Sequence, residues 1–596
     1  MSSIKPVLDV RSLHTELLVG EKWKTIVHPL SFSILPGETL ALVGESGSGK
    51  SVTANSLLQL LPQSQCRISG EVHFQDRDLL RFTSRQMQAI RGNRIGMIFQ
   101  EPMSSLNPVL TIGTQITEVL RKHRHMDSAS ARAEAVRLLD RVQISAAAER
   151  LSDYPLHFSG GMRQRVVIAI ALACKPALLI ADEPTTALDV TVQAEILQLI
   201  KSLQREENMA VLFITHDMGV VAEVADKTLV MYQGQEVEMA STRELFRQPK
   251  HAYTKRLLAA VPKLGDMAGI PYPQPFHSVT RIEGNTVQSG APVLEVKNLC
   301  QQFPIRQGWL RRIKAQVHAV EQVSFQLLPG ETLGLVGESG CGKSTLARTL
   351  IRLAEASAGQ VILENENLLT ANRRQLEVMR RKIQLIFQDP WESLNPRLRV
   401  GDALAEPMLA HGLIEQSESR RAVAELLESV GLEASMAERF PHQFSGGQRQ
   451  RICIARALAV QPKVIIADES VSALDVTVRA EIINLLMALQ RERGISILFI
   501  SHDMAVVERI SHRVAVMYQG KIVEIGSRQA IFETPAHPYT RHLLSAVPIA
   551  DPEQVIKPLV PFRKTGTQRR GINDSASAVI YQQQGLDHYV LSDAGV

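Results

Sequence analysis

The stretch GETLALVGESGSGKS, Gly37 to Ser51, joins an apolar run to a glycine-rich loop that ends in lysine and serine. The chain repeats it from Gly330 to Ser344 as GETLGLVGESGCGKS, with two of the fifteen positions changed. Both copies fit the pattern G-x-x-x-x-G-K-[ST], in which N–H groups of a loop and of the following helix surround phosphate oxygens. Each copy therefore predicts a strand, a triphosphate-binding loop and a helix.

The residue types in the loop match what a triphosphate requires. Glycines permit tight turns and a close approach of the backbone to phosphate. The lysine can reach the β- and γ-phosphates, and the serine hydroxyl can ligate Mg²⁺. A glycine-rich turn without a ligand is the alternative, and the strand context disfavours it. The predicted ATP-binding residues of the two loops are Gly44, Gly47, Gly49, Lys50, Ser51 and Val52, and Gly337, Gly340, Gly342, Lys343, Ser344 and Thr345.

Further segments recur at a constant interval. The segment FSGGMRQR begins at Phe158, and its counterpart FSGGQRQR begins 286 residues later, at Phe444. The same 286 residues separate the acidic pair of LLIADE from that of VIIADE, and THD from SHD. Landmarks in one order at a fixed spacing indicate a duplicated domain. The first copy is predicted to span residues 1–263 and the second residues 292–550. Residues 264–291 are predicted to form a Pro- and Gly-rich linker, and residues 551–596 a polar, poorly ordered tail.

Apolar runs alternate with amphipathic stretches in both copies. TLALVG, ALLIAD and AVLFIT are continuous runs, as in strands of a sheet that is covered on both faces. The fold class is therefore predicted to be α/β with a largely parallel sheet. Helical spacing is found in two sets of residues, Val136, Leu139 and Val142, and Val423, Leu427 and Val430.

The composition argues against several classes of protein. The 596 residues carry a formal net charge of +5 and no dominant basic run, so nucleic acid is not an expected partner. The five cysteines are scattered and lack metal-ligand spacing. No signal-peptide core and no run of about 20 apolar residues is found. The chain is therefore expected to be soluble and to meet a membrane only through partners.

Acidic pairs follow an apolar strand in each copy, at Asp182–Glu183 and at Asp468–Glu469. At such a place one carboxylate can hold Mg²⁺ and its neighbour can orient or deprotonate water. A solvent-facing acidic pair is the alternative, which recurrence beside both loops disfavours. Other candidates follow strands as well: the histidines His216 and His502, and the glutamines Gln100 and Gln388. The predicted Mg²⁺ ligands are Ser51, Gln100, Asp182, Ser344, Gln388 and Asp468.

These residues, in this order, resemble the ATP-binding domains of ABC transporters, and the two SGG segments are the most specific part of the likeness. The resemblance implies two tandem ABC-type P-loop ATPase domains, each with a helical subdomain. It implies that the SGG segment of one domain completes the phosphate loop of the other. It also implies two hydrolysis-competent sites, with Glu183 and Glu469 as general bases and His216 and His502 beside them. The residues that it adds to the ATP sites are Ser159, Gly160, Gly161, Asp189, Ser445, Gly446, Gly447, Gln448 and Asp475.

The sequence departs from the family pattern at a few positions. Met162 stands where the first SGG segment usually has glutamine, and Ser470 replaces the proline after the second glutamate. These departures predict unequal affinities of the two sites. The adenine-stacking aromatic residue of the second copy is predicted to be Phe303, and its counterpart in the first is Leu17 or Trp23.

The segments HAYTKRLLAAVP, from His251, and HPYTRHLLSAVP, from His537, are similar to the C-terminal extension of peptide and nickel importer ATPases. PYPQPF in the linker and HYV near the end are similar to the ATP-binding subunits of glutathione importers. The resemblance implies import of glutathione or small peptides; an oligopeptide, microcin or nickel importer is the alternative. A soluble ABC-type translation factor is disfavoured because the linker is not a charged helical arm.

The implied cofactors are ATP and Mg²⁺. No cysteine follows Cys453, so no iron–sulfur cluster is expected in the extension. The implied partners are two inner-membrane permease subunits and a periplasmic solute-binding protein. The transported substrate would reach the permease and not this chain, which is expected at the cytoplasmic face of the bacterial inner membrane.

Overall fold

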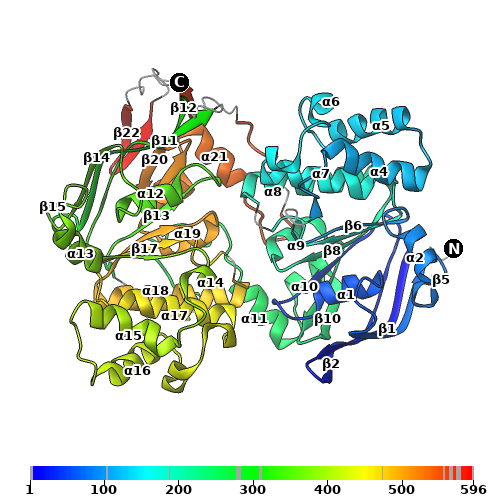
Figure 1. The fold of residues 1–596 in the computed structure, drawn as a ribbon, viewed down its shortest axis with the longest axis horizontal. Helices are drawn as coiled ribbons and strands as arrows, with labels where there is room; N and C mark the ends of the chain where they lie inside the picture. The colour runs from blue at the N-terminus through cyan, green and yellow to red at the C-terminus, as the bar shows by residue number, and fades with distance from the viewer. Residues whose placement is uncertain are drawn as a thin grey trace. The chain divides into compact units, whose positions relative to one another are not determined.

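The structure is a computed structural model, whose contacts divide the chain into two compact units (Figure 1). Unit 1 is Met1–Val261 with Pro548–Lys557, and unit 2 is Pro262–Val547 with Pro558–Val596. In the described part of the chain, no helix is both long and apolar enough to span a membrane. The described residues are 5–101, 105–186, 188–276, 284–307, 312–472, 474–554, 558–562, 568–571 and 579–592.

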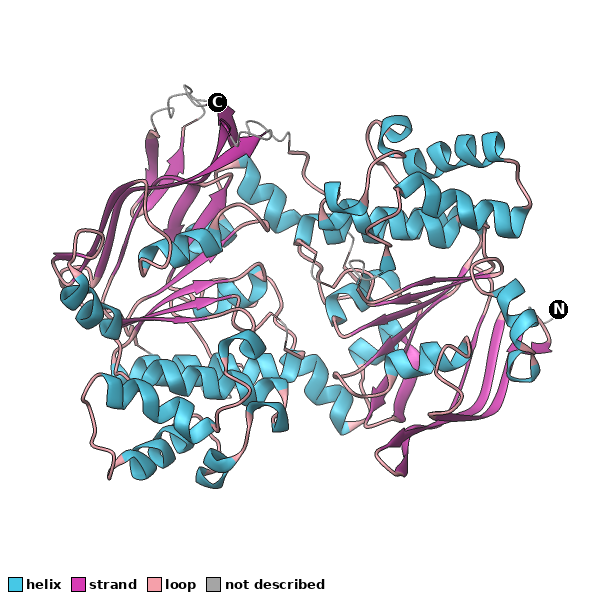
Figure 2. Cartoon of the chain, viewed as in Figure 1, coloured by secondary structure: helices cyan, strands magenta, loops and turns pink. Residues whose placement is uncertain are grey.

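Unit 1 contains both strands and helices (Figure 2). Its strands are β1 (Leu8–Val19), β2 (Lys22–Ile34), β3 (Thr39–Val43), β4 (Cys66–Phe74), β5 (Arg77–Asp78), β6 (Ile95–Ile98), β7 (Leu178–Asp182), β8 (Ala210–Thr215), β9 (Lys227–Tyr232) and β10 (Gln235–Ser241). Its helices are α1 (Lys50–Leu57), α2 (Ser84–Ile90), α4 (Ile112–Arg124), α5 (Ser128–Arg141), α6 (Ala147–Arg150), α7 (Gly160–Leu172), α8 (Val190–Glu207), α9 (Met218–Val224), α10 (Thr242–Arg247) and α11 (Ala252–Ala260).

The central sheet of unit 1 has the strand order β10-β9-β3-β8-β7-β6. Strands β3, β7 and β8 are buried along their whole length, so both faces of the sheet require apolar side chains. β3 pairs parallel with β8 and β9, and only the edge strand β10 is antiparallel to its neighbour. The predicted strands and the largely parallel sheet are confirmed. Parallel pairing brings the carboxyl ends of β3, β7 and β8 to one edge, where ligands bind in such sheets.

A helical part and a second sheet complete unit 1. Helices α4, α5 and α7 contact one another, and Figure 1 shows them gathered at the end of the unit away from β1 and β2. The antiparallel sheet has the order β2-β1-β4-β5. The predicted helix at Val136 and Leu139 is α5, with Val142 as its C-cap.

Unit 2 repeats this architecture. Its central sheet has the order β16-β17-β18-β13-β19-β20-β23-β22, and its antiparallel sheet has the order β15-β14-β11-β12-β21. Its strands are β11 (Leu294–Gln307), β12 (Arg312–Leu327), β13 (Thr332–Val336), β14 (Ala358–Leu363), β15 (Glu366–Asn367), β16 (Ile383–Ile386), β17 (Val464–Asp468), β18 (Ser496–Ile500), β19 (Arg513–Tyr518), β20 (Lys521–Ser527), β21 (Arg569–Gly571), β22 (Tyr581–Gly585) and β23 (His588–Leu591). Its helices are α12 (Lys343–Leu350), α13 (Arg373–Lys382), α14 (Pro390–Ser393), α15 (Val400–Ala410), α16 (Ser419–Ser429), α17 (Gly446–Leu458), α18 (Val476–Arg493), α19 (Met504–Ile510), α20 (Arg528–Glu533) and α21 (Pro538–Ser545).

The polar tail extends both sheets of unit 2. Strand β21 pairs with β12, and β23 pairs with β20 and β22. The Arg570 guanidinium donates to both carboxylate oxygens of Glu321, at 2.7 and 3.0 Å, and His588 Nε2 lies 2.8 Å from Glu524 Oε1. The expectation of a poorly ordered tail is wrong for residues 568–571 and 579–592, because their polar side chains meet carboxylates buried in the domain.

The described part of the predicted linker packs on unit 2. The Arg528 guanidinium donates to the Met267 carbonyl at 2.9 Å, and Asn484 exchanges hydrogen bonds with the backbone of Phe276 at 2.7 and 3.1 Å. Met267 and Phe276 are buried. Composition alone does not show these contacts, because each apolar anchor is isolated among Pro, Gly and polar residues. The segment PYPQPF is described in full, whereas residues 277–283 of the linker lie outside the described residues.

Candidate functional site

The glycine-rich loop of unit 1 lies between β3 and α1 and has a backbone that requires glycine. Gly44 has φ of 156°, and a Cβ there would lie 2.2 Å from the Met231 carbonyl oxygen. Gly49 has φ of 96° and is the N-cap of α1. The loop of unit 2 has the same form, with φ of 151° at Gly337 and 114° at Gly342. Strand, loop and helix are therefore arranged as the sequence predicts, with a helix N-terminus at the loop.

A buried lysine closes each loop. Lys50 Nζ donates to the carbonyls of Gly44 and Glu45 at 2.7 and 2.9 Å. Lys343 Nζ donates to the carbonyls of Gly337 and Glu338 at 2.7 and 3.1 Å. The ammonium group is thus held on the loop, within reach of any phosphate group that the loop surrounds.

The first carboxylate of each acidic pair faces the loop serine. Ser51 Oγ donates to Asp182 Oδ1 at 3.1 Å, and Ser344 Oγ donates to Asp468 Oδ1 at 3.1 Å. Burial raises the pKa of Asp182 to about 6, although the hydrogen bond from Ser51 opposes the rise. Burial likewise raises the pKa of Asp468. A hydroxyl and a carboxylate that converge in this way fit the oxygen ligands that Mg²⁺ prefers.

The second carboxylate of unit 1 is held by polar side chains on several sides. Glu183 has φ of 47° and accepts from Gln100 Nε2 at 3.1 Å and from Thr186 Oγ1 at 2.9 Å, while His216 Nδ1 lies 3.3 Å from Oε1. Burial alone would raise the pKa of Glu183, but the contacts with His216, Thr186 and Lys50 outweigh it and lower the pKa to about 2. The carboxylate is therefore ionised and oriented, as a base or a water-positioning group must be.

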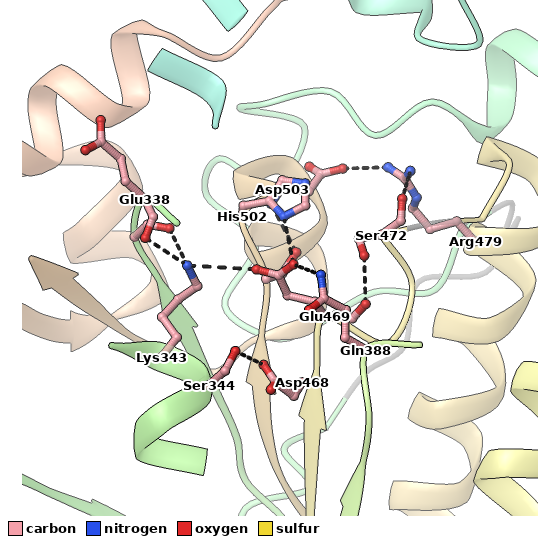
Figure 3. A network of polar contacts seen from close by, with 12 residues as sticks. Glu338, Lys343, Ser344, Gln388, Asp468, Glu469, Ser472, Arg479, His502 and Asp503 are labelled. Atoms are coloured by element: carbon pink, nitrogen blue, oxygen red, sulfur yellow. Dashed lines mark hydrogen bonds and ion pairs between the residues drawn. The ribbon is translucent and has the colours of Figure 1, made fainter. Parts of the chain in front are cut away.

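Unit 2 brings the same residue types together, with differences in their contacts (Figure 3). Gln388 Nε2 donates to Glu469 Oε2 at 2.9 Å, His502 Nδ1 lies 3.6 Å from the same oxygen, and Lys343 Nζ lies 3.9 Å from Oε1. Although burial opposes it, the contact with His502 lowers the pKa of Glu469. Ser472 stands in the place of Thr186, and its hydroxyl donates to the Glu469 backbone carbonyl at 2.9 Å.

The SGG segments begin α7 and α17. Ser159 Oγ accepts from the Met162 N–H, and Ser445 Oγ accepts from the Gln448 N–H, both at 3.3 Å. Gln448 also accepts from the Ser445 N–H at 3.1 Å, and the capping box that results has no counterpart at Met162. Helix α17 is therefore capped by one more hydrogen bond than α7.

The glycines of these segments lie against the helix that follows the acidic pair. A Cβ at Gly161 would lie 2.5 Å from Val192 Cγ1, and one at Gly447 would lie 2.4 Å from Val478 Cγ1. Only glycine fits there without displacing α8 or α18. Asp189 and Asp475 directly precede these two helices.

The aromatic candidates for adenine differ in exposure. Phe303, on β11, is 44% exposed. Trp23 is half-buried, with the Arg67 guanidinium 4.0 Å from its ring centroid, so one ring face is covered. Leu17 is half-buried on β1 and pairs with Lys24, whereas the residue opposite Trp23 is Leu18. The adenine contacts stay predictions.

Sequence reasoning missed three groups that the structure brings to the site. Thr186 donates to Glu183, and Ser472 and Arg479 support the backbone after Glu469. Thr186 and Ser472 could have been found in the sequence, because each is a hydroxyl residue three positions after a glutamate of an acidic pair. No sequence signal identifies Arg479, because its counterpart in the first copy is Gln193.

Two family models match the chain, each of them twice. The model for ABC transporters matches residues 27–186 and 320–472, and the model for the C-terminal region of oligopeptide/dipeptide transporters matches residues 237–283 and 523–570. The chain is 54% identical to the glutathione import ATP-binding protein GsiA of Escherichia coli strain K12, with 98% of this chain and 96% of that protein covered. It is 54% identical to the protein of the same name from Pectobacterium atrosepticum, with 98% and 97% covered. A solved dimeric ATP-binding cassette in a post-hydrolysis state with ADP and phosphate aligns at 29% identity and a TM-score of 0.36, with 39% of this chain and 98% of the cassette covered.

Proposed function

This chain belongs to the ABC transporter family, and we propose that it is the ATP-hydrolysing subunit of a bacterial importer of glutathione. It is an ATPase with two ABC domains. The observation that supports hydrolysis in both domains is the repeated arrangement of an ionised glutamate, a histidine and a glutamine beside a phosphate loop. Glutathione is proposed from the names of the relatives, since no residue of an ATPase site selects the transported substrate.

The residues have separate tasks in this proposal. The loop N–H groups with Lys50 and Lys343 bind the ATP phosphates. Ser51 with Asp182, and Ser344 with Asp468, would hold Mg²⁺, which neutralises phosphate charge when bound. Gln100 and Gln388 are proposed to complete its surroundings.

The second carboxylates do the proton chemistry. Glu183 and Glu469 orient the attacking water and accept its proton, and His216 and His502 hold these carboxylates in place. The same proposal includes three further kinds of contact. Ser159 and Ser445 would contact phosphate, Asp189 and Asp475 would lie near the sites, and Phe303 would contact adenine.

The proposed partners are two permease subunits in the bacterial inner membrane and a periplasmic solute-binding protein, with this chain at the cytoplasmic face. The match of both domains to the peptide-transporter C-terminal region supports an importer over other ABC proteins. The substrate is proposed to enter through the permease and not to touch this chain.

The test is uptake of labelled glutathione by cells that express this chain with the permease and binding-protein genes adjacent to its own. Unlabelled glutathione and a neutral dipeptide serve as competitors, and the Glu183→Gln/Glu469→Gln variant serves as the inactive control. Uptake that only glutathione blocks, and that the control lacks, is expected. Uptake of the dipeptide but not of glutathione would move the chain to the peptide importers while leaving its ATPase chemistry intact.

A further inference from the structure

The importer-type extension touches the phosphate loop through one tyrosine in each unit. Tyr253 Oη accepts from the Glu45 N–H at 3.2 Å, and Tyr539 Oη accepts from the Glu338 N–H at 3.0 Å. Both tyrosines belong to the HAYT and HPYT segments, to which hydrolysis assigns no task. Because the same contact recurs in both units, it is a property of the domain and not of one copy.

The loop residue that the tyrosine contacts is also a partner of the phosphate-loop lysine. In unit 1 the Glu45 carbonyl accepts from Lys50 Nζ at 2.9 Å, and in unit 2 the Glu338 carbonyl accepts from Lys343 Nζ at 3.1 Å. Figure 3 shows the link between Lys343 and Glu338. One loop residue is therefore held through its N–H by the extension and through its carbonyl by the lysine.

The tyrosine of unit 1 is itself held in place by contacts within the domain. Glu238, on β10, accepts from the N–H groups of Lys250 and His251 at 2.8 and 3.0 Å. His251 Nδ1 then accepts from the Tyr253 N–H at 3.2 Å and caps α11. The Tyr253 ring lies against Tyr232, with centroids 4.3 Å apart, and is buried.

Unit 2 builds the same support from matching residues. Glu524, on β20, accepts from the Ala536 and His537 N–H groups at 2.8 and 3.1 Å, and His537 Nδ1 accepts from the Tyr539 N–H at 3.1 Å. The Tyr539 ring lies 4.4 Å from that of Tyr518 and is fully buried. Both hydroxyl groups are therefore preorganised, which lowers the entropy cost of holding the loop.

We propose that Tyr253 and Tyr539 are positioning residues that fix each phosphate loop for ATP, so that the importer-type extension sets nucleotide affinity. The lysine ammonium has three donors, of which the two loop carbonyls take two, so it can bind a phosphate oxygen without leaving the loop. The tyrosine keeps the loop residue that holds the lysine in place while ATP binds. Its loss therefore weakens ATP binding more than it slows the chemical step.

The test rests on the proposed ATPase function. It compares the two tyrosines of each ring pair, Tyr253 with Tyr232 and Tyr539 with Tyr518. The test variant is Tyr253→Phe/Tyr539→Phe, which removes only the two hydroxyl groups. The matched control is Tyr232→Phe/Tyr518→Phe, because those hydroxyls accept from the side chains of Gln233 and Gln519 at 3.3 and 3.1 Å. On the full chain, the ATP Kd and the KM are expected to rise about fivefold in the test variant, while kcat changes less than twofold. The control is expected to match the wild type.

Each other outcome has a defined meaning. An unchanged Kd in Tyr253→Phe/Tyr539→Phe, or an equal rise in the control, overturns the inference. Lys50→Ala/Lys343→Ala tests the ATP sites themselves: ATP binding that survives it counts against the proposed function and not against the tyrosines alone.

A second measurement covers the case in which the double variant fails to fold. Amide hydrogen exchange of segments 44–50 and 337–343 is compared between each single Tyr→Phe variant and the wild type. Faster exchange confined to the loop of the altered unit is expected. Exchange that stays as in the wild type would overturn the inference.

Discussion

Two neighbouring carboxylates in each site are given opposite properties by their surroundings. Burial raises the pKa of Asp182 to about 6, while the contacts of Glu183 overcome its burial and lower its pKa to about 2. Carboxylates whose pKa values are pushed apart in this way commonly have separate tasks. Here the first fits a cation ligand and the second fits an ionised base.

The first prediction concerns that base. Glu183→Gln/Glu469→Gln is expected to lower the ATP hydrolysis rate by about 10² to 10³-fold, because an amide cannot accept the proton of the attacking water. ATP affinity is expected to stay within about twofold, because the phosphate loops are untouched. Steady-state hydrolysis and equilibrium ATP binding check both points. Hydrolysis within threefold of the wild type would contradict the assignment of both glutamates.

A second residue-scale feature exists in unit 2 alone. Arg479, on α18, donates to Asp503 Oδ2 at 2.8 Å and to the carbonyls of Leu474 and Ser472 at 3.1 and 3.4 Å (Figure 3). Its side chain is mostly buried. The guanidinium thus joins the backbone that follows Glu469 to the residue that follows His502.

Removing that link is expected to slow hydrolysis without unfolding the domain. Arg479→Gln, which installs the residue type of the first copy, is expected to lower kcat about fivefold, because small misplacements of reacting groups are costly. Asp503→Asn breaks the same link but keeps the cap of α19, so a similar loss of kcat is expected. Gln193→Ala, at the matching position of unit 1, serves as the control. Fully additive losses in Arg479→Gln/Asp503→Asn would show that the two residues act separately.

At the scale of elements, the sequence predicted best where one local pattern decides the structure. The strand, loop and helix around Lys50 and Lys343 follow from residues adjacent in sequence. Strands β21 and β23 could not be predicted, because they pair with β12 and β20 through polar residues such as Arg570 and His588. Their partners Glu321 and Glu524 are buried carboxylates, which a sequence pattern does not distinguish from exposed ones.

The tail is expected to stabilise unit 2 through one buried ion pair. Glu321 is 2% exposed and is bound by both arms of the Arg570 guanidinium. Arg570→Ala is expected to lower the free energy of unfolding of unit 2 by about 3 kcal/mol, because among the described residues it leaves the buried carboxylate with Lys521, at 3.9 Å, as its remaining cation. Urea unfolding measures the loss. Arg570→Met/Glu321→Leu, which removes both charges, is expected to recover most of it, and equal instability of the two variants would contradict the ion-pair explanation.

At the scale of the whole molecule, duplication predicted two similar domains and could not predict how they differ. His512 accepts from the Thr332 N–H at 3.0 Å in unit 2, and Asp226 accepts from the Thr39 N–H at 2.8 Å in unit 1. The two residues occupy the same place in the repeat, but one is a carboxylate and the other is an imidazole whose pKa burial lowers. Differences of this kind depend on burial, which only the folded domains reveal.

The pH dependence of unit 2 is expected to follow from His512. Burial lowers its pKa to about 4, so between pH 6.5 and 4 the unfolded chain binds the proton and the folded domain does not. The free energy of unfolding of unit 2 is therefore not reduced by His512 above pH 6.5, and it falls by at most about 3 kcal/mol as the pH falls towards 4. Urea unfolding at pH 7.5 and 5 measures this fall in the free energy of unfolding. The measurement uses a Trp23→Phe background, because both remaining tryptophans then lie in unit 2. His512→Gln is expected to flatten the dependence, and an unflattened profile would assign it to another group.

The pairing of β23 with β20 has a consequence for how the protein is made. β20 leaves the ribosome well before β23 does, so its outer edge stays unpaired while the rest of unit 2 is already available for folding. Unpaired strand edges invite association with other chains. Nascent or prematurely terminated chains that lack β23 are therefore expected to be bound by chaperones, and a stop codon placed before His588 is expected to give a chain that aggregates.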